Sequence, residues 1–398
     1  MNVTMNKSFL ILSLFVSLLA CQSKKSTNET PTQKEILISL DEDRCYDMSK
    51  FLSYHSFVVL ESNDESVIGE INKIQLSDNY ILVLDKTQGT LFMFDSQGTY
   101  INKIARKGRG HGEYMNADDF YYDAQTDHIY MYDGLSGKVV EYDMQANYIA
   151  HYPISKGQNM IKVVSSGDWL LYRGNGAADF SKNKSYNNLV VYNSAWKVIK
   201  EDLPFNKYLL GRRYDVGSME PIFSYYYGKI YILPSMSDKV YAYNCGNRSM
   251  ETAYLIHFKG YEKQVIDEHM EEKPLRELIS KIYQFEYPGY INHFHKDGEL
   301  LSFTFNYKDN KGSLMCFYNE LTGETKVCDC TLDENGLFVF PASYWCEAEN
   351  KLVLGVVEGL SFKRSRRKNP DNPVLRAISE KAGEVGEMNP VLVFYTIN

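Results

Sequence analysis

The segment ILVLDKTQGTLFMFDSQGTY (81–100) is written a second time, 48 residues later, as IYMYDGLSGKVVEYDMQANY (129–148). Each copy contains an alternating apolar run, a turn with a glycine, a second alternating run and another turn. Alternation with period two is typical of half-buried β-strands, and short polar breaks between such runs are typical of hairpin turns. The repeated unit is therefore a meander of antiparallel strands.

Weaker copies of the unit follow at LVVYNSAWKVI (189–199), KVYAYNCGNRSM (239–250) and SLMCFYNELTGETKV (313–327). Each copy places an aromatic residue and an Asp or Asn before a polar turn. Such a side chain closes the turn by accepting hydrogen bonds from backbone N–H groups two residues on. We interpret these Asp and Asn residues as turn builders rather than as catalytic acids.

Repeats of about 40 to 50 residues that carry about four strands each are typical of propeller blades, because one four-stranded sheet buries both its faces only when neighbours stack against it in a ring. We therefore predict an all-β fold, a six-bladed β-propeller of four-stranded antiparallel blades, with five or seven blades as the margin. The expected blades cover 71–104, 117–154, 161–204, 219–259, 288–332 and 343–398. The last blade lacks one strand, which an N-terminal strand at 57–61 would supply, leaving no open sheet edge.

The start of the chain has the pattern of an export signal. Lys7 precedes an apolar run of about a dozen residues, too short to span a bilayer. The run ends in Leu18-Leu19-Ala20-Cys21, which resembles a bacterial lipobox whose cysteine becomes lipidated. We predict a lipoprotein signal peptide over 1–20, a flexible polar tether over 21–33 and a single propeller domain over 34–398. Ordinary secretion, with Cys21 in a discarded peptide, is the alternative.

The amino-acid composition limits the kinds of partner that the chain can bind. The formal net charge of −8 argues against nucleic acid. The 32 Tyr and 20 Phe beside only 11 Pro suit strands. Tyrosine-rich runs such as SYYYGKIYIL (224–233) are interpreted as core, although a Tyr near the channel could stack on a sugar. The tether lacks an acidic stretch, which favours the periplasmic side of the envelope over the cell surface. We expect a monomer, anchored to the membrane through Cys21, without a cofactor.

Six cysteines follow Cys21, in a compartment that permits disulfides. They are Cys45, Cys245, Cys316, Cys328, Cys330 and Cys346. The spacing does not choose a pairing, although Cys316, Cys328 and Cys330 lie on one expected hairpin and could include a bridge.

Two stretches interrupt the meander. Residues 265–285 have helical spacing, and 361–389 form a long insertion in the last blade, with a short helical piece at 374–381. The insertion carries five cations, which form either a solvated loop or an arm that contacts phosphate or anionic lipid headgroups. These are Lys363, Arg364, Arg366, Arg367 and Lys368. Long insertions on a rigid scaffold often carry specificity.

The glycine-rich run GRGHGEY (108–114) joins the outermost strand of blade one to the innermost strand of blade two. Its glycines permit positive φ angles and close backbone approach. A phosphate cradle is excluded, since neither a strand-to-helix transition nor a Lys-Ser/Thr pair accompanies the glycines. Two interpretations remain: a structural crossover, or a site for an anionic ligand at the channel mouth. The residues of that site would be Arg106, Arg109, His111, Glu113 and Tyr114.

Motifs of known catalytic chemistry are missing from the sequence, which has neither Gly-x-Ser-x-Gly nor His-Glu-x-x-His. His293 and His295 lie two apart, so on a regular strand they would face the same way and could share a metal. A third ligand is not evident, and a polar surface pair is the simpler interpretation. We predict neither catalytic residues nor a metal site.

Four stretches together resemble the six-bladed β-propeller lipoproteins of Bacteroidetes, which are themselves similar to NHL-repeat propellers. They are FVVLES (57–62), VIGEINKI (67–74), IARKGRGHGEYMNADDFYYD (104–123) and MNPVLVFYTIN (388–398). The resemblance covers 34–398. Its most specific part is the glycine-rich loop, where the family has Gly-Pro-Gly-Glu-Tyr and this chain has His111 in place of the proline. It implies a fold and an envelope location but no reaction.

The sequence therefore favours a lipid-anchored module that binds a ligand at its channel mouth, namely a glycan, a peptide or an envelope protein. The alternatives are a hydrolase or lyase with an active site in the channel, since propellers host chemistry without linear motifs, and a scaffold subunit of an envelope complex.

Overall fold

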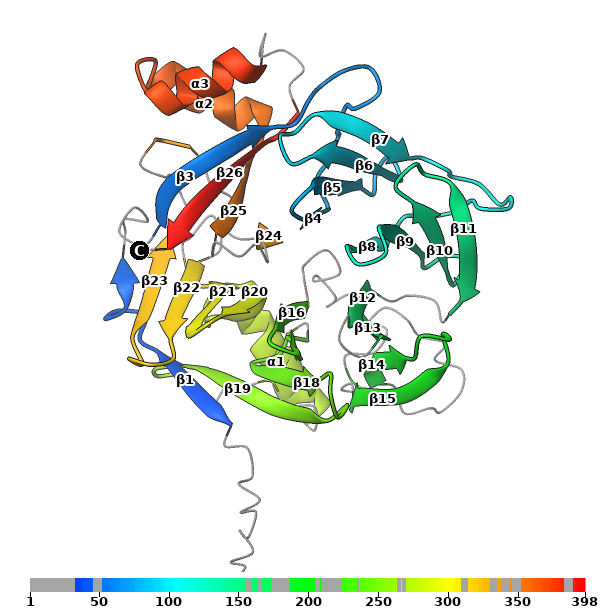
Figure 1. Ribbon diagram of the computed structural model, residues 1–398. Helices are drawn as coiled ribbons and strands as arrows, with labels where there is room; N and C mark the ends of the chain where they lie inside the picture. The colour runs from blue at the N-terminus through cyan, green and yellow to red at the C-terminus, as the bar shows by residue number, and fades with distance from the viewer. Residues whose placement is uncertain are drawn as a thin grey trace, which may run out of the picture. The chain divides into compact units, whose positions relative to one another are not determined.

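Figure 1 shows a computed structural model whose strands form six sheets arranged as the blades of a β-propeller. The structure describes residues 33–45, 52–154, 159–163, 167–172, 187–204, 208, 223–234, 236–262, 266, 270–308, 314–329, 335–337, 344–345, 352–382 and 389–397. The predicted signal peptide, Cys21 and the tether up to residue 32 lie outside these residues, as do Cys330 and Cys346.

Each blade is a meander whose first strand is innermost. Blade one contains β4 (Lys73–Leu76), β5 (Tyr80–Asp85), β6 (Thr90–Asp95) and β7 (Tyr100–Ile104). Blade two contains β8 (Asp119–Asp123), β9 (His128–Asp133), β10 (Lys138–Asp143) and β11 (Tyr148–Pro153). Blade three contains β12 (Asn159–Val163), β13 (Asp168–Tyr172), β14 (Asn187–Tyr192) and β15 (Val198–Pro204).

Blade four contains β16 (Phe223–Tyr226), β17 (Lys229–Ile232), β18 (Lys239–Asn244) and β19 (Met250–Phe258). Blade five contains β20 (Gly289–Asp297), β21 (Leu300–Asn306), β22 (Leu314–Asn319) and β23 (Thr325–Asp329). Blade six contains β24 (Tyr344–Trp345), β25 (Leu352–Val357), β26 (Val391–Ile397) and β3 (Leu52–Val59). The six-bladed fold predicted from the repeat is confirmed.

The ring is closed by the two ends of the chain. Strand β3 pairs antiparallel with β26, from Val391 opposite Val59 to Ile397 opposite Leu52. The N-terminal strand thus completes the last blade, as the sequence predicted, and becomes its outermost strand with β26 as its partner.

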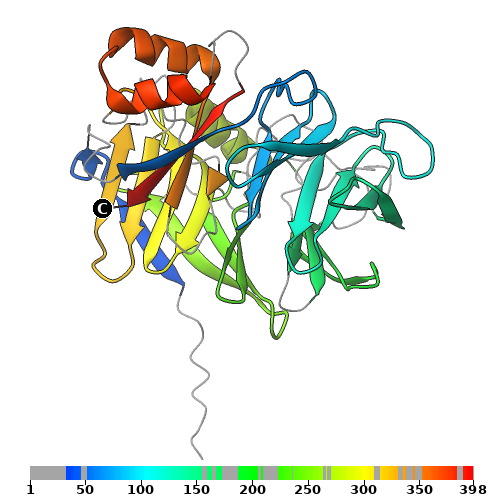
Figure 2. The same ribbon diagram turned by 45° about the horizontal axis from the view of Figure 1, so that its top comes forward.

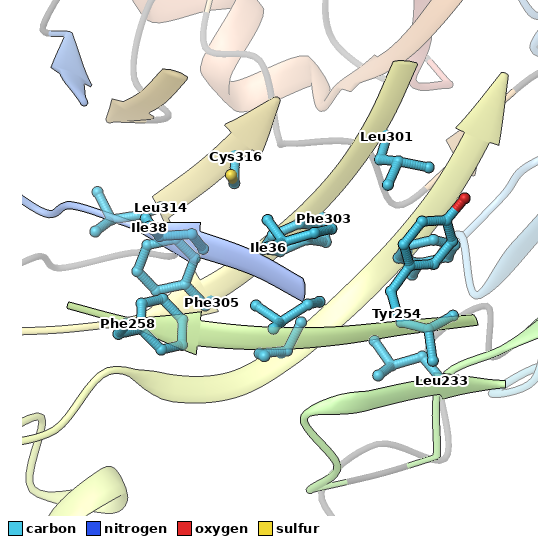
Figure 3. Close-up of a cluster of buried hydrophobic side chains, with 14 of the residues drawn as sticks. Ile36, Ile38, Leu233, Tyr254, Phe258, Leu301, Phe303, Phe305, Leu314 and Cys316 are labelled. Carbon is cyan, nitrogen blue, oxygen red and sulfur yellow. The ribbon is translucent and has the colours of Figure 1, made fainter. Parts of the chain in front are cut away.

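Two short strands were not predicted. Strand β1 (Lys34–Ile38) pairs parallel with β19, and β2 (Arg44–Cys45) pairs parallel with β23, so blades four and five each gain a fifth, outer strand. Figure 3 shows Ile36 and Ile38 of β1 among the buried side chains of blades four and five. Burial of these two residues fixes the start of the domain to the ring.

The Asp and Asn residues of the repeat close turns, as predicted. In the turn after the third strand, the side-chain oxygen accepts backbone N–H bonds from residues two to four positions on. The five residues that do so are Asp95, Asp143, Asn193, Asn244 and Asn319. A second set, Asp85 and Asp133, ties the entry of a blade to the turn after its second strand. Both carboxylates therefore serve as acceptors for backbone N–H groups.

The blades pack through apolar and aromatic side chains on both faces of each sheet. Between blades two and three, for example, Trp169 stacks on Trp196 with ring centres 4.4 Å apart, and Tyr152 stacks on Trp196 at 5.1 Å. The two hairpin cysteines that the structure describes lie on opposite faces: Cys316 is in the core between blades four and five, and Cys328 is in the core beneath the helices of blade six. A disulfide between those two is therefore excluded.

Three helices interrupt the meander. Helix α1 (Glu272–Tyr283) lies between blades four and five, within the predicted helical stretch. Helices α2 (Gly359–Lys368) and α3 (Pro373–Ala382) form a helical hairpin between β25 and β26. The piece predicted at 374–381 is α3, whereas the cationic run is on α2 and is helical, not a loop. None of the described helices has the length and apolar character to cross a membrane.

The two faces of the ring differ in their connections. Because every blade is an antiparallel meander, the turns after first and third strands share one face, which we call the turn face, and the remaining connections share the other, the loop face. No turn on the turn face exceeds six residues, whereas the loop face carries the long connections 259–288 and 358–390. Figure 2 shows the helical hairpin α2–α3 rising above the ring on one side.

Candidate binding surfaces

The glycine-rich loop is a crossover from β7 to β8 that is locked by its own side chains. The Tyr114 ring is closed to solvent, and its hydroxyl donates toward the carbonyl oxygens of Gly89 (2.7 Å) and Ile104 (3.0 Å). Burial raises the pKa of Tyr114 to about 12. Glu113 folds back so that Oε2 accepts the Gly110 N–H at 2.6 Å. Tyr114 and Glu113 therefore have structural partners inside the loop.

Gly112 is needed for a close approach. It has a φ of 70°, and a Cβ at this position would lie 2.8 Å from the Tyr148 ring. Its carbonyl accepts the Tyr142 hydroxyl at 2.8 Å. These contacts hold the tip of the loop against the third and outermost strands of blade two.

The remaining residues of the predicted site are exposed, but at the edge of the ring. The His111 ring packs edge-on against Tyr148 of the outermost strand β11, with ring centres 4.4 Å apart. Arg106 and Arg109 are exposed. Figure 1 shows the loop between β7 and β8 extending outward beside β11. The position differs from the expected channel mouth because the crossover fills the outer gap between two blades before it turns inward.

The two histidines on the innermost strand of blade five do not act as a pair. Two register shifts, between Gly289 and Asn292 and between Asn292 and His295, break the alternation of β20, and His293 has a φ of 52°. His293 Nδ1 lies 2.8 Å from Thr304 Oγ1, whereas His295 Nδ1 lies 3.3 Å from Ser224 Oγ of blade four. Burial lowers the pKa of His295 to about 4. The expectation that both rings face the same way is thus wrong, because bulges re-aim side chains.

Other charged groups join neighbouring blades. Lys73 Nζ pairs with Asp119 at 2.7 Å, linking blades one and two. The Arg248 guanidinium binds both oxygens of the buried Asp168 carboxylate, at 2.7 and 2.9 Å, linking blades three and four. Among the described residues, no group of three or more His, Cys, Asp or Glu is placed to hold a metal.

The helical hairpin on the loop face presents a concentration of positive charge. Phe362, Leu375 and Ile378 are fully buried against blade six and fix the hairpin in place. Arg364, Arg367 and Lys368 are exposed, and Lys363 and Arg366 are half-buried. Within the described chain none of these five cations forms an ion pair, and Arg366 donates to the backbone carbonyl of Pro370. Three of the cations lie in the last turn of α2, where they interact favourably with the negative end of the helix dipole.

A different surface lies on the turn face of blades four and five. Tyr227, in the turn between β16 and β17, is 86% exposed, and Leu321, in the turn between β22 and β23, is 77% exposed. The carboxylate of Glu320, next to Leu321, binds Lys34 Nζ at 2.8 Å and also Lys296 Nζ. Lys296 Nζ lies 5.2 Å from the centre of the Tyr226 ring. This surface was not predicted from the sequence, because a run of tyrosines resembles a core strand.

The fold and these surfaces define a six-bladed β-propeller with helical insertions on one face. Residues 35–396 match the family described as "Domain of unknown function (DUF4934)", and the chain belongs to this family. None of the proteins of curated function matches it in sequence.

Solved structures share the fold at low sequence identity. A candidate exported protein from Bacteroides fragilis is 18% identical, with a TM-score of 0.68 over 92% of this chain and 100% of that one. A member of the DUF4221 family from Bacteroides vulgatus is 10% identical, with a TM-score of 0.53 over 88% of this chain and 99% of that one. These likenesses show the fold alone.

Proposed function

We propose that this protein is a lipid-anchored binding module of the cell envelope that takes an anionic ligand on its loop face. The observation that carries the proposal is the hairpin α2–α3, which fixes the five cations Lys363, Arg364, Arg366, Arg367 and Lys368 on a rigid support in an otherwise acidic protein. A disordered basic arm loses conformational entropy on binding, whereas cations on packed helices are already ordered.

The chemistry of the ligand follows from the donors. Guanidinium groups bind phosphate and carboxylate through paired N–H donors. Among the described residues, none of the five cations is paired with a carboxylate, and Arg366 donates to the Pro370 carbonyl. A glycan, peptide or envelope protein that carries such anions fits this surface. The exposed Arg106 and Arg109 of the glycine-rich loop offer two further cations at the edge of the ring.

The proposed location is the periplasmic side of the envelope, with Cys21 lipidated and the protein a monomer. The export signal and lipobox in the sequence support this, and the Bacteroides fragilis structure with the same fold is described as exported. A hydrolase or lyase in the channel and a scaffold role are the alternatives, and no contact among the described residues favours either.

The test is binding of polyanionic probes, namely tripolyphosphate and uronic-acid oligosaccharides, measured by titration calorimetry. The double variant R364E/R367E changes the charge by four units, so at about 0.2–1 kcal/mol per exposed interaction the affinity should fall by roughly tenfold or more. The control K197E/K273E makes the same charge change at exposed cations outside the hairpin. Equal losses in both variants would show that only net charge matters and would reject the hairpin as the site.

A further inference from the structure

We propose that the turn face of blades four and five rests on the membrane that holds the lipid anchor, with Tyr227 and Leu321 in the headgroup layer. The proposal rests on the proposed lipidation of Cys21. It concerns how the propeller is oriented, and so which of its faces a ligand can reach.

Tyr227 and Leu321 are the two most exposed large apolar residues of the described chain, at 86% and 77%. Single exposed apolar residues are ordinary on protein surfaces. These two, however, stand at the tips of turns on the same face of adjacent blades, where a flat surface could contact both.

Tyr227 also has an unfavourable backbone. Its φ is 43°, in the left-handed region that bulky residues rarely adopt, and Gly228 follows with a φ of 72°. Asn or Asp would suit the first position of this two-residue turn better. Tyr227 thus combines an unfavourable backbone with 86% exposure, although its ring packs edge-on against the Tyr226 ring, with ring centres 4.7 Å apart. A contact with a lipid surface would add to this single ring contact and bury the exposed part of the side chain.

The chain enters the ring beside these two residues. Strand β1 runs parallel to β19, which starts at the turn face, so Lys34 lies toward that face. Its ammonium group pairs with Glu320, the neighbour of Leu321, at 2.8 Å. From Cys21 to Lys34 the chain spans at most roughly 45 Å when fully extended. A lipid at Cys21 therefore holds the propeller within that distance of the bilayer, and the tether joins the propeller from the turn-face side of blade five.

The local chemistry suits a lipid interface. Tyrosine is enriched at the level of the headgroups, because its ring is apolar and its hydroxyl is polar. The charge of Glu320 is compensated by Lys34 and Lys296, and its Oε1 also accepts the Tyr254 hydroxyl at 3.0 Å. Burial raises the pKa of Tyr226, and the nearby carboxylates of Asp297 and Glu299 raise it further. These acids disfavour a strongly anionic bilayer, so the contact relies on the apolar tips and the anchor.

This orientation turns the loop face, with the cations of α2, away from the anchoring membrane. The cations then meet soluble or opposing anionic partners rather than the headgroups beside the anchor. The proposed ligand site and the proposed membrane contact lie on opposite faces and do not compete.

The test places tryptophan probes on the two faces of the mature chain, which starts at residue 21. A hexahistidine tag at its N-terminus binds vesicles of zwitterionic lipid that contain a nickel-chelating lipid and a nitroxide-labelled lipid. The variants Tyr227→Trp and Leu321→Trp probe the turn face. The controls Leu135→Trp and Leu360→Trp use the exposed leucines of the loop face, which are 58% and 69% exposed. Emission is compared with the unsubstituted chain, and melting temperatures confirm folding.

We expect the emission added at 227 and 321 to shift to the blue and to lose most of its intensity to the nitroxide, while emission from 135 and 360 stays unchanged. Quenching of the loop-face probes alone, or equal quenching of all four, would overturn the proposed orientation. The tag holds the chain at residue 21 whether or not Cys21 is acylated in the cell. Mass spectrometry of the native protein therefore tests the anchor separately.

Discussion

Replacing Tyr114 with phenylalanine separates the two interpretations of the glycine-rich loop. The change keeps the buried ring and deletes the hydroxyl, which donates toward the Gly89 and Ile104 carbonyls and accepts the Arg106 N–H at 3.3 Å. At roughly 1 kcal/mol for each buried group left without its partner, the free energy of unfolding should fall by about 2–3 kcal/mol. An unfolding entropy of about 2.1 cal/mol/K per residue over some 365 residues converts this to a fall in melting temperature of about 3–4 °C.

The assay is thermal unfolding followed by calorimetry, with Tyr227→Phe as the control. Tyr227 is 86% exposed, so the same loss of a hydroxyl there should leave the melting temperature unchanged. If Tyr114→Phe unfolds at the wild-type temperature yet binds polyanions more weakly, the Tyr114 hydroxyl contributes to ligand binding and its structural role in the crossover is refuted.

Two further predictions concern contacts between blades. Arg248→Met leaves the buried Asp168 carboxylate without its guanidinium partner and should lower the denaturant midpoint, because a buried charge then lacks its opposite charge. Denaturant titration measures the midpoint, and an unchanged value would show that the pair is not stabilising. Burial lowers the pKa of His295 to about 4 in the folded protein, below the usual value of about 6.5. As the pH falls from about 6.5 to 4, the unfolded chain binds a proton at this histidine that the folded protein does not. The folded state therefore loses stability over that pH interval. His295→Gln should flatten the dependence of the melting temperature on pH by up to about 3–4 °C in that range, and parallel curves for the two proteins would contradict the assignment.

The blade count and the closing strand were predictable because both depend on local signals. The copies at 81–100 and 129–148 repeat the alternation and the turn chemistry at a fixed offset, and the run at 57–61 had no other partner. The strand β1 was missed because its pairing with β19 joins residues more than 200 positions apart, and five residues hold too little pattern to indicate it. Parallel addition of a strand depends on tertiary packing, here of Ile36 and Ile38.

Helix α2 was missed for a different reason. Its cations occupy most of its surface, so the sequence shows only a short apolar stripe, and the helix depends on burial of Phe362 beneath the hairpin. The bulges of β20 likewise leave no mark in the residue pattern, which made His293 and His295 look equivalent. Tyr227 could not be told from its neighbours Tyr225 and Tyr226, because only the position of the turn decides which of the three leaves the sheet.

The pairing of β3 with β26 has a consequence for the order of synthesis and folding. The residues that complete the last blade are among the final ones to be synthesised, while their partner is among the first, so the circle can shut only when the whole polypeptide has been delivered. A chain that ends before residue 391 lacks β26, so β3 loses its partner strand and the sixth blade is incomplete. Unpaired strand edges expose a truncated product to proteolysis, so we expect only the full-length chain to accumulate.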